Sequence, residues 1–185
     1  RRREYLKVCA DLLTDHLQLL VDAWSGTYKS TFLGLPQETA LKNMFTSIAI
    51  LTKGELAGER VFVAYDNRDQ EDEHSCFSDN TDRDLRLNLE GVLNVYNGSY
   101  KTISGASLKD LVIEANETKG LEVNAAITNA STLVNATATP FDFAISNETE
   151  RVKVLASVNG LNDLGDKFVE GASAIGIIIS ADLPD

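Results

Sequence analysis

Residues 4–24, EYLKVCADLLTDHLQLLVDAW, decide the fold class. Apolar side chains, together with one histidine, recur there at steps of three and four residues: Tyr5, Val8, Cys9, Leu12, Leu13, His16, Leu17, Leu20 and Trp24. This spacing is that of an apolar side of an α-helix. The chain is therefore expected to open with a helix.

The same helical period continues along the chain. We expect the segment SGTYKSTFLGLP, residues 25–36, to be a loop that ends the first helix. Pro36 suits the first turn of a second helix. Two further apolar stripes follow, the first made of Leu41, Met44, Phe45, Ile48 and Leu51 and the second of Leu85, Leu89, Val92, Leu93 and Tyr96.

Three later helix starts carry capping signals. Thr81 with Asp84, Ser107 with Asp110 and Asn147 with Glu150 each place a capping side chain three residues before an acid. A helix rich in small residues is expected within residues 120–140, and a last helix over residues 148–179. The segment GIIIS, residues 176–180, has strand propensity, but a lone strand has no partner, so helix is favoured. The chain is predicted to be all-α, a single up-and-down bundle of five or six helices over residues 1–185.

Composition excludes several classes of protein. The net charge of −11 argues against a nucleic-acid partner, which would require a basic surface. No apolar run is long enough for a transmembrane segment. The chain starts without Met inside a helical pattern, so we expect it to be part of a longer protein.

The stretch QEDEHSCFSDNTDRD, residues 70–84, is unusually acidic and holds one of the two histidines and one of the two cysteines. Extending the second helix at 100° per residue places a largely acidic group of side chains on its inward side: Glu55, Glu59, Phe62, Asp66, Gln70 and Glu73. Val61, Ala64 and Tyr65 would then lie on the other side. This pattern predicts that residues 54–74 are covered from two directions.

Acids at residues 71–73 would lie in the last turn of that helix, where the helix dipole disfavours them. We expect Arg68 to offset part of this cost through contacts with Glu71 and Asp72. Glu71 and His74 would lie one turn apart, the half-motif of carboxylate metal sites in helical bundles. They are the predicted metal ligands, and a charged helix end with a structural histidine is the alternative. Cys76 is expected to be a packed thiol or to form a disulfide with Cys9.

Three segments resemble the C-terminal half of the imelysin-like family of bacterial exported proteins. They are GELAGERVFVAYDNRDQEDEHSCFSDNTDRD, GVLNVYNGSY and PFDFAI. The resemblance implies two related helical bundles, export to the periplasm or outer membrane, and a link to iron uptake. Members are classed as metallopeptidases. The family's Gly-x-His-x-x-Glu motif belongs to the N-terminal half and is absent from this sequence.

The resemblance implies a binding cleft shared with an upstream N-terminal half of the same precursor. Its walls would be Glu59, Arg60, Glu71, Asp72, Glu73, His74, Ser75, Cys76, Asp79, Asn80, Thr81, Asn94, Tyr96 and Tyr100. One function that follows is a cation- or iron-binding component of a bacterial iron-uptake system, with an iron-uptake partner and a divalent or iron cation as the bound group. The alternative is an exported metal-dependent peptidase that acts on a peptide substrate.

Overall fold

The computed structural model describes residues 1–181. The chain divides into two compact units, residues 1–40 and residues 41–185, and each is described by itself. The predicted single domain over residues 1–185 stays a prediction. Most of the chain is helical, and the all-α prediction is confirmed.

The first unit consists of α1 (Arg2–Ser25), α2 (Thr27–Leu33) and the first residues of α3 (Gln37–Ile50). The helix predicted at residues 4–24 is confirmed. The segment expected as a loop contains α2, whose Tyr28 and Phe32 rings pack on Trp24 at centroid distances of 4.8 and 5.6 Å. Within the first unit no residue of α1 is buried.

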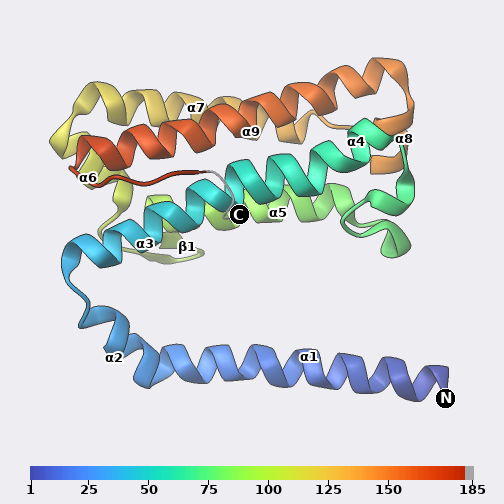
Figure 1. Ribbon diagram of the computed structural model, residues 1–185, viewed down its shortest axis with the longest axis horizontal. Coiled ribbons are helices and arrows are strands. Elements are labelled where there is room, and N and C mark those ends of the chain that lie inside the picture. The colour runs from blue at the N-terminus through green and yellow to red at the C-terminus, as the bar shows by residue number, and fades with distance from the viewer. Residues whose placement is uncertain (182–185) are drawn as a thin grey trace. The chain divides into compact units, whose positions relative to one another are not determined.

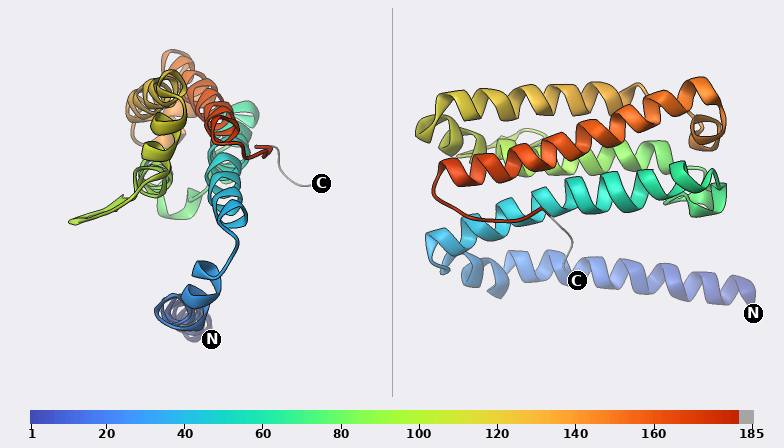
Figure 2. Two further views of the ribbon diagram at one scale, coloured as in Figure 1. Left: turned by 90° about the vertical axis from the view of Figure 1, so that its left-hand side faces the viewer. Right: turned by 45° about the horizontal axis from the view of Figure 1, so that its top comes forward.

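Within residues 41–181 the second unit is an up-and-down bundle of four helical rods, and Figures 1 and 2 show how they run. The first rod runs through α3, the π-helix η1 (Leu51–Phe62) and α4 (Val63–Asn67). The others are α5 (Thr81–Asn97), α7 (Glu117–Asn135) and α9 (Glu148–Ala174). Each rod packs against the next around the ring, η1 on α5, α5 on α7, α7 on α9 and α9 on η1. The predicted helical bundle is therefore confirmed.

Short elements connect the rods. The 3-10 turns η2 (Gln70–Asp72) and η3 (Cys76–Ser78) precede α5, and a hairpin of β1 (Ser99–Tyr100) and β2 (Ile103–Ser104) follows it. The helices α6 (Leu108–Ala115) and α8 (Phe141–Ser146) precede α7 and α9. The expected caps are present at two starts, since Ser107 accepts from the Asp110 N–H at 3.0 Å and Asn147 accepts from the Glu150 N–H at 3.2 Å.

The core lies between the four rods. Its largest fully buried side chains come from the first rod, α5, α9 and the short helices α6 and α8, while α7 contributes smaller side chains such as Val123 and Ala130. The largest side chains include Phe45, Leu56, Leu85, Tyr96, Phe141, Leu161 and Phe168. Burial of each such apolar side chain stabilises the fold by about 1.5–3 kcal/mol. The apolar stripes predicted around Phe45 and Leu85 are thus the stripes that face the core.

The π-helix η1 overturns the register predicted for residues 51–66. In a π-helix each N–H bonds the carbonyl five residues earlier, so the chain turns less per residue than in an α-helix. The buried positions after Ala49 are therefore Thr52, Leu56, Ala57, Val61 and Ala64. Extrapolation at 100° per residue was wrong here. Glu59, Phe62 and Asp66 are exposed, and the apolar side of this segment is simply its core side.

The last helix ends earlier than predicted. Gly176 has a left-handed φ of 82°, and the N–H groups of Gly176 and Ile177 bond the carbonyls of Ser173 and Ala172 at 3.0 and 2.9 Å. This pair of bonds is a Schellman motif, which ends α9 at Ala174. Residues 177–180 are neither helix nor strand, so the helix expected there is wrong.

Candidate functional site

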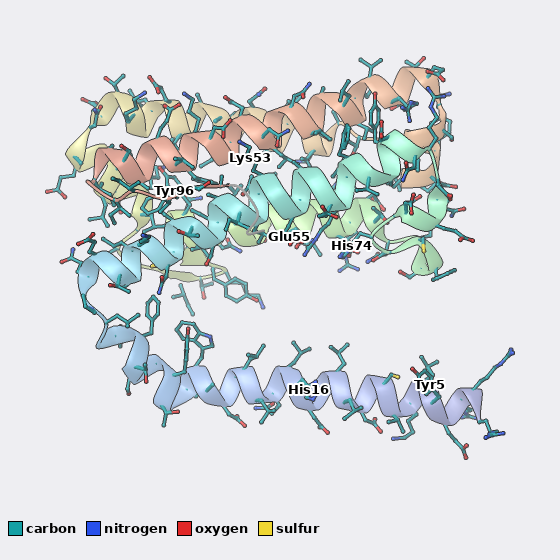
Figure 3. All side chains as sticks on the ribbon, viewed as in Figure 1. Tyr5, His16, Lys53, Glu55, His74 and Tyr96 are labelled. Atoms are coloured by element: carbon teal, nitrogen blue, oxygen red, sulfur yellow. The ribbon has the colours of Figure 1, made fainter. Side chains whose placement is uncertain are left out.

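The acidic stretch forms a loop at the end of the bundle where α4 leads into α5 (Figure 3). The helix predicted to run to residue 74 ends at Asn67, because Arg68 has a left-handed φ of 54°. Glu71 lies in the turn η2, and His74 follows it outside any helix. The one-turn helical spacing predicted for these two residues is therefore absent. The α-helix end predicted at residues 71–73, where the helix dipole would disfavour acidic side chains, is also absent.

Arg68 does not contact the acids that were expected to bind it. Its guanidinium contacts Glu148 at the start of α9 at 2.6 Å. The loop acids have other partners, since Asp69 accepts from the Glu71 N–H at 2.9 Å and Asp72 accepts from the Asn67 side chain at 2.8 Å. This part of the loop is held by local polar contacts.

His74 is instead paired with Asp84, in the first turn of α5. Its Nδ1 lies 3.0 Å from Asp84 Oδ2. The same carboxylate accepts a short hydrogen bond from the Ser75 hydroxyl and a bond of 3.1 Å from the Asn80 amide. Thr81, predicted as a helix cap, accepts from the Ser75 N–H at 3.1 Å instead. The start of α5 thus organises the loop, and the capping box predicted for Thr81 and Asp84 is wrong.

The electrostatics of Asp84 determine which nitrogen of His74 carries a proton. Burial would raise the pKa of Asp84, but hydrogen bonds from Ser75, His74 and Asn80 and the charge of His74 outweigh it, so the pKa is below its ordinary value. An ionised carboxylate only accepts hydrogen bonds, so His74 Nδ1 must be the donor. In the neutral imidazole, Nε2 then keeps a free lone pair. The His74 side chain is 37% exposed.

Glu73 has the opposite environment. It is 5% exposed, and within residues 1–181 no donor meets ordinary hydrogen-bond geometry at either of its carboxylate oxygens. Burial raises its pKa above the ordinary value, and the charges of Asp142, Asp79 and Asp82 raise it further, while the Thr81 hydroxyl acts in the opposite direction. A buried acid without a partner is costly, so Glu73 needs an explanation beyond packing.

A second chain of contacts reaches Asp84 from the π-helix. The Arg60 guanidinium donates to the Asn88 side chain at 2.7 Å, and the Asn88 amide donates to the Asp84 carbonyl at 2.7 Å. Glu55 lies 3.7 Å from Arg60. The sequence prediction missed Asp84 and Asn88 as site residues. Their spacing from Thr81, three and seven residues, places all three on one side of a helix and is the signal that could have found them.

The structure brings only part of the predicted cleft together. Residues around His74 that share contacts are Glu73, His74, Ser75, Asn80 and Thr81, and Arg60 joins them through Asn88. The exposed acids Glu59, Glu71, Asp72 and Asp79 do not contact the imidazole, whose partners among the described residues are Asp84 and Ser75.

The remaining predicted wall residues lie elsewhere on or after α5. Tyr96 is about 18 Å further along this helix than Asp84, and Figure 3 shows it far from His74. It is a core residue that packs on Phe168, and burial raises its pKa to about 12, with Asp110 acting in the same direction. Asn94 is half-buried on α5, and Tyr100 is exposed on the hairpin. These residues do not contribute to the surface around His74.

The cysteines do not form the disulfide that was one alternative. Cys9 and Cys76 are both free thiols, and Cys76 is half-buried in η3. Within residues 1–181, no group of three or more His, Cys, Asp and Glu side chains is placed to hold a metal ion. Among the described helices, none has the length and apolar character needed to cross a membrane.

A family comparison accounts for most of the chain. The family model described as Imelysin, a peptidase family, matches residues 1–168, which include the whole acidic loop and α5. No curated protein matches the chain. The match agrees with the resemblance found in the acidic stretch. The chain belongs to the imelysin family.

Proposed function

We propose that this protein is a cation- or iron-binding component of a bacterial iron-uptake system. The observation that carries the proposal is the pairing of His74 Nδ1 with Asp84 at 3.0 Å. Histidines that bind metals usually donate their other ring N–H to a carboxylate, which fixes the ring and makes the free nitrogen more basic. His74 meets this requirement, and its Nε2 is the proposed ligand atom.

The proposed cation is iron or a similar divalent ion. Around His74 the loop offers carboxylate, amide and hydroxyl oxygens, and hard oxygen ligands with one imidazole suit such ions. In our proposal the upstream half of the precursor supplies the other ligands, so the acidic loop is one wall of a cleft shared by two bundles. The predicted pair of Glu71 and His74 is replaced by His74 oriented by Asp84.

The proposed partner is inferred from the exposed side of α1, and the proposed location from the family resemblance. Within the first unit the apolar side of α1 buries no residue, and contiguous exposed apolar surfaces usually mark an interaction site. We propose that the upstream half covers it. Location in the periplasm or at the outer membrane remains a proposal derived from the resemblance alone.

The test is a cation titration of the chain with its upstream half, by calorimetry with Fe²⁺ or Co²⁺. We expect His74→Ala to weaken binding at least about tenfold and Asp84→Asn to weaken it about 10–100-fold, as for other residues that orient metal ligands. The control is Glu114→Gln, an exposed acid on α6 that lies outside both proposed binding surfaces. Equal affinities for His74→Ala and Glu114→Gln would refute the proposal.

The peptidase alternative has one observation in its favour besides the family description. An imidazole oriented by a carboxylate is also the arrangement of a general base, which needs a free nitrogen toward water or substrate. A proteolysis assay of both halves together, with and without a chelator, separates the two functions. Chelator-sensitive cleavage that is lost in His74→Ala would favour the peptidase, and cation binding without cleavage would favour the uptake component.

A further inference from the structure

Phe77 is the most exposed large apolar side chain among residues 1–181. It is 96% exposed and lies in the turn η3, in the middle of the acidic loop. Single exposed apolar side chains are common on protein surfaces, so exposure alone assigns no role to Phe77. Its role is inferred from the turn that carries it and from the charges beside it.

The turn that carries Phe77 is held by hydrogen bonds on both sides. The Ser78 N–H and hydroxyl donate to the Ser75 carbonyl at 3.1 and 3.2 Å. The Ser75 N–H donates to the Thr81 hydroxyl at 3.1 Å, which ties the turn to α5. Asp79 ends the turn with a left-handed φ of 48°. Phe77 is therefore presented by a fixed turn, and a group that is already held in place loses less conformational freedom on binding.

Exposed carboxylates lie beside this turn. The turn η2, which contains Glu71 and Asp72, packs against η3, and Asp79 follows Phe77 by two residues. All three acids are exposed, and within residues 1–181 none of them forms an ion pair with a basic side chain. The side-chain donor to Asp72 is the neutral amide of Asn67. The surface around Phe77 thus carries negative charge that the described part of the chain does not balance.

We infer that Phe77 is the apolar anchor of a protein–protein contact, in which its ring enters an apolar pocket rimmed by Lys or Arg side chains on the upstream half of the precursor. The inference rests on the proposed function, which places that half against the acidic loop, but it uses no atom of His74. Interfaces concentrate their binding free energy in a few aromatic side chains that a polar rim surrounds. The unbalanced carboxylates favour a basic partner by charge complementarity.

The same charges disfavour two other occupants of this surface. An anionic lipid surface attracts basic segments, and it repels carboxylates. A second copy of the chain in a two-fold contact would place the acidic loop against itself, because such a contact uses the same patch on both copies. A basic protein surface meets neither objection.

The experiment is photo-cross-linking in the intact precursor, with p-benzoylphenylalanine in place of Phe77 and mass spectrometry to locate the cross-linked segment. We expect a cross-link to the upstream half, at an apolar site flanked by Lys or Arg. Since Phe77 is 96% exposed, the replacement leaves the packing of this chain unchanged. The control carries the same label at Ile103, which is 70% exposed on β2 beyond the other end of α5, and it should not cross-link to that site.

A charge reversal tests the basic rim. With the label at position 77, Glu71→Lys should lower the cross-link yield at least about threefold, because like charges across an interface repel. Glu114→Lys, at an exposed position on α6, is the matched control and should leave the yield unchanged. A yield that Glu71→Lys does not lower would overturn the inference.

The cross-linked site also separates this inference from the proposed function. A label at position 77 that reaches no site in the upstream half, or that marks a second copy or added phosphatidylglycerol vesicles instead, overturns the inference. Loss of Fe²⁺ binding in His74→Ala alongside that result would leave the proposed function intact. The expected cross-link, together with Fe²⁺ binding that is indifferent to His74, would keep the docking contact and remove the cation site.

Discussion

Glutamates in two acidic regions of the bundle have opposite electrostatic environments. On α7 and α9, Glu170 accepts from Lys119 and from Lys167, both at 2.9 Å, beside a cavity of about 480 Å³. Hydrogen bonds from Lys167 and Lys119 lower the pKa of Glu170. In the loop before α5, Glu73 is buried with no basic partner among residues 1–181, and burial raises its pKa while the Thr81 hydroxyl acts in the opposite direction. The first region pairs its carboxylate with two lysines, as is typical of structural ion pairs, and the second keeps a buried carboxylate that no basic side chain of the described residues pairs with.

The largest effect is expected from Asp84→Ala, which removes the carboxylate that organises the loop. Asp84 accepts from His74, Ser75 and Asn80, and hydrogen bonds to charged groups contribute about 1.5–3 kcal/mol each without being additive. We expect a loss of about 2–4 kcal/mol in the free energy of unfolding, measured with urea. A loss as small as that of an ordinary surface substitution would mean that the loop does not depend on Asp84.

The substitution Glu73→Gln is expected to raise the free energy of unfolding, whereas Asp84→Ala lowers it. In EDTA at neutral pH, the ionised form of Glu73 is buried without a donor, and such an unsatisfied group costs about 1–3 kcal/mol. The uncharged glutamine is expected to raise the free energy of unfolding by about 1 kcal/mol, measured by the same urea experiment. A destabilised variant under these conditions would show that Glu73 has a favourable partner, and the contrast with Glu170 would fail.

The pH dependence of the two glutamates should also run in opposite directions. The pKa of Glu73 is raised in the folded state, so its unfolded form releases a proton first, and the wild type loses stability relative to Glu73→Gln as pH rises above about 4.5. The pKa of Glu170 is lowered, so its contribution is present at neutral pH and is lost as pH falls below about 4.5. Urea unfolding of wild type and both Gln variants across this range, in EDTA, measures the two slopes. Slopes of the same sign would contradict the assignment of the two environments.

The smallest effect is expected from Glu170→Gln. Glu170 and its lysines are partly exposed, and ion pairs of this kind contribute about 0–1 kcal/mol, less at high salt. We expect a loss of at most about 1 kcal/mol that shrinks when NaCl is added. A larger loss that salt does not reduce would mean that the ion pairs of Glu170 with Lys119 and Lys167 stabilise the fold as much as the contacts of Asp84 do.

Helical periodicity and caps are local properties, and they were predicted well. The helix at residues 4–24, the core stripes around Phe45 and Leu85, and the caps Ser107 and Asn147 depend on side chains within a few positions of each other. The end of α9 was also local, since Gly176 takes the left-handed conformation that ends a helix, but its strand-prone neighbours masked the signal.

The site was predicted only in part, because its geometry depends on a change of helix type and on contacts between elements. The acidic stretch and His74 were identified, but the π-helix η1 changed the direction of the side chains expected on the inward side of residues 51–66. The left-handed Arg68 then ended the helix before Glu71. Neither event has a strong sequence signal, so the pairing of Glu71 with His74 could not be corrected from the sequence.

The sequence by itself determined that the chain is helical, acidic and related to the imelysin family. Amino-acid composition, helical periodicity and sequence motifs do not depend on contacts between distant segments. The tertiary structure alone decided that Asp84 orients His74, and that Glu73 is buried beside Asp82 and Asp142. Burial depends on which distant segments pack together, and the hydrogen bond from Thr139 to Asp82 links segments that lie 57 positions apart. A carboxylate therefore has the same sequence signature whether it is paired with lysines, as Glu170 on α9, or buried with no basic partner in the described part of the chain, as Glu73 before α5.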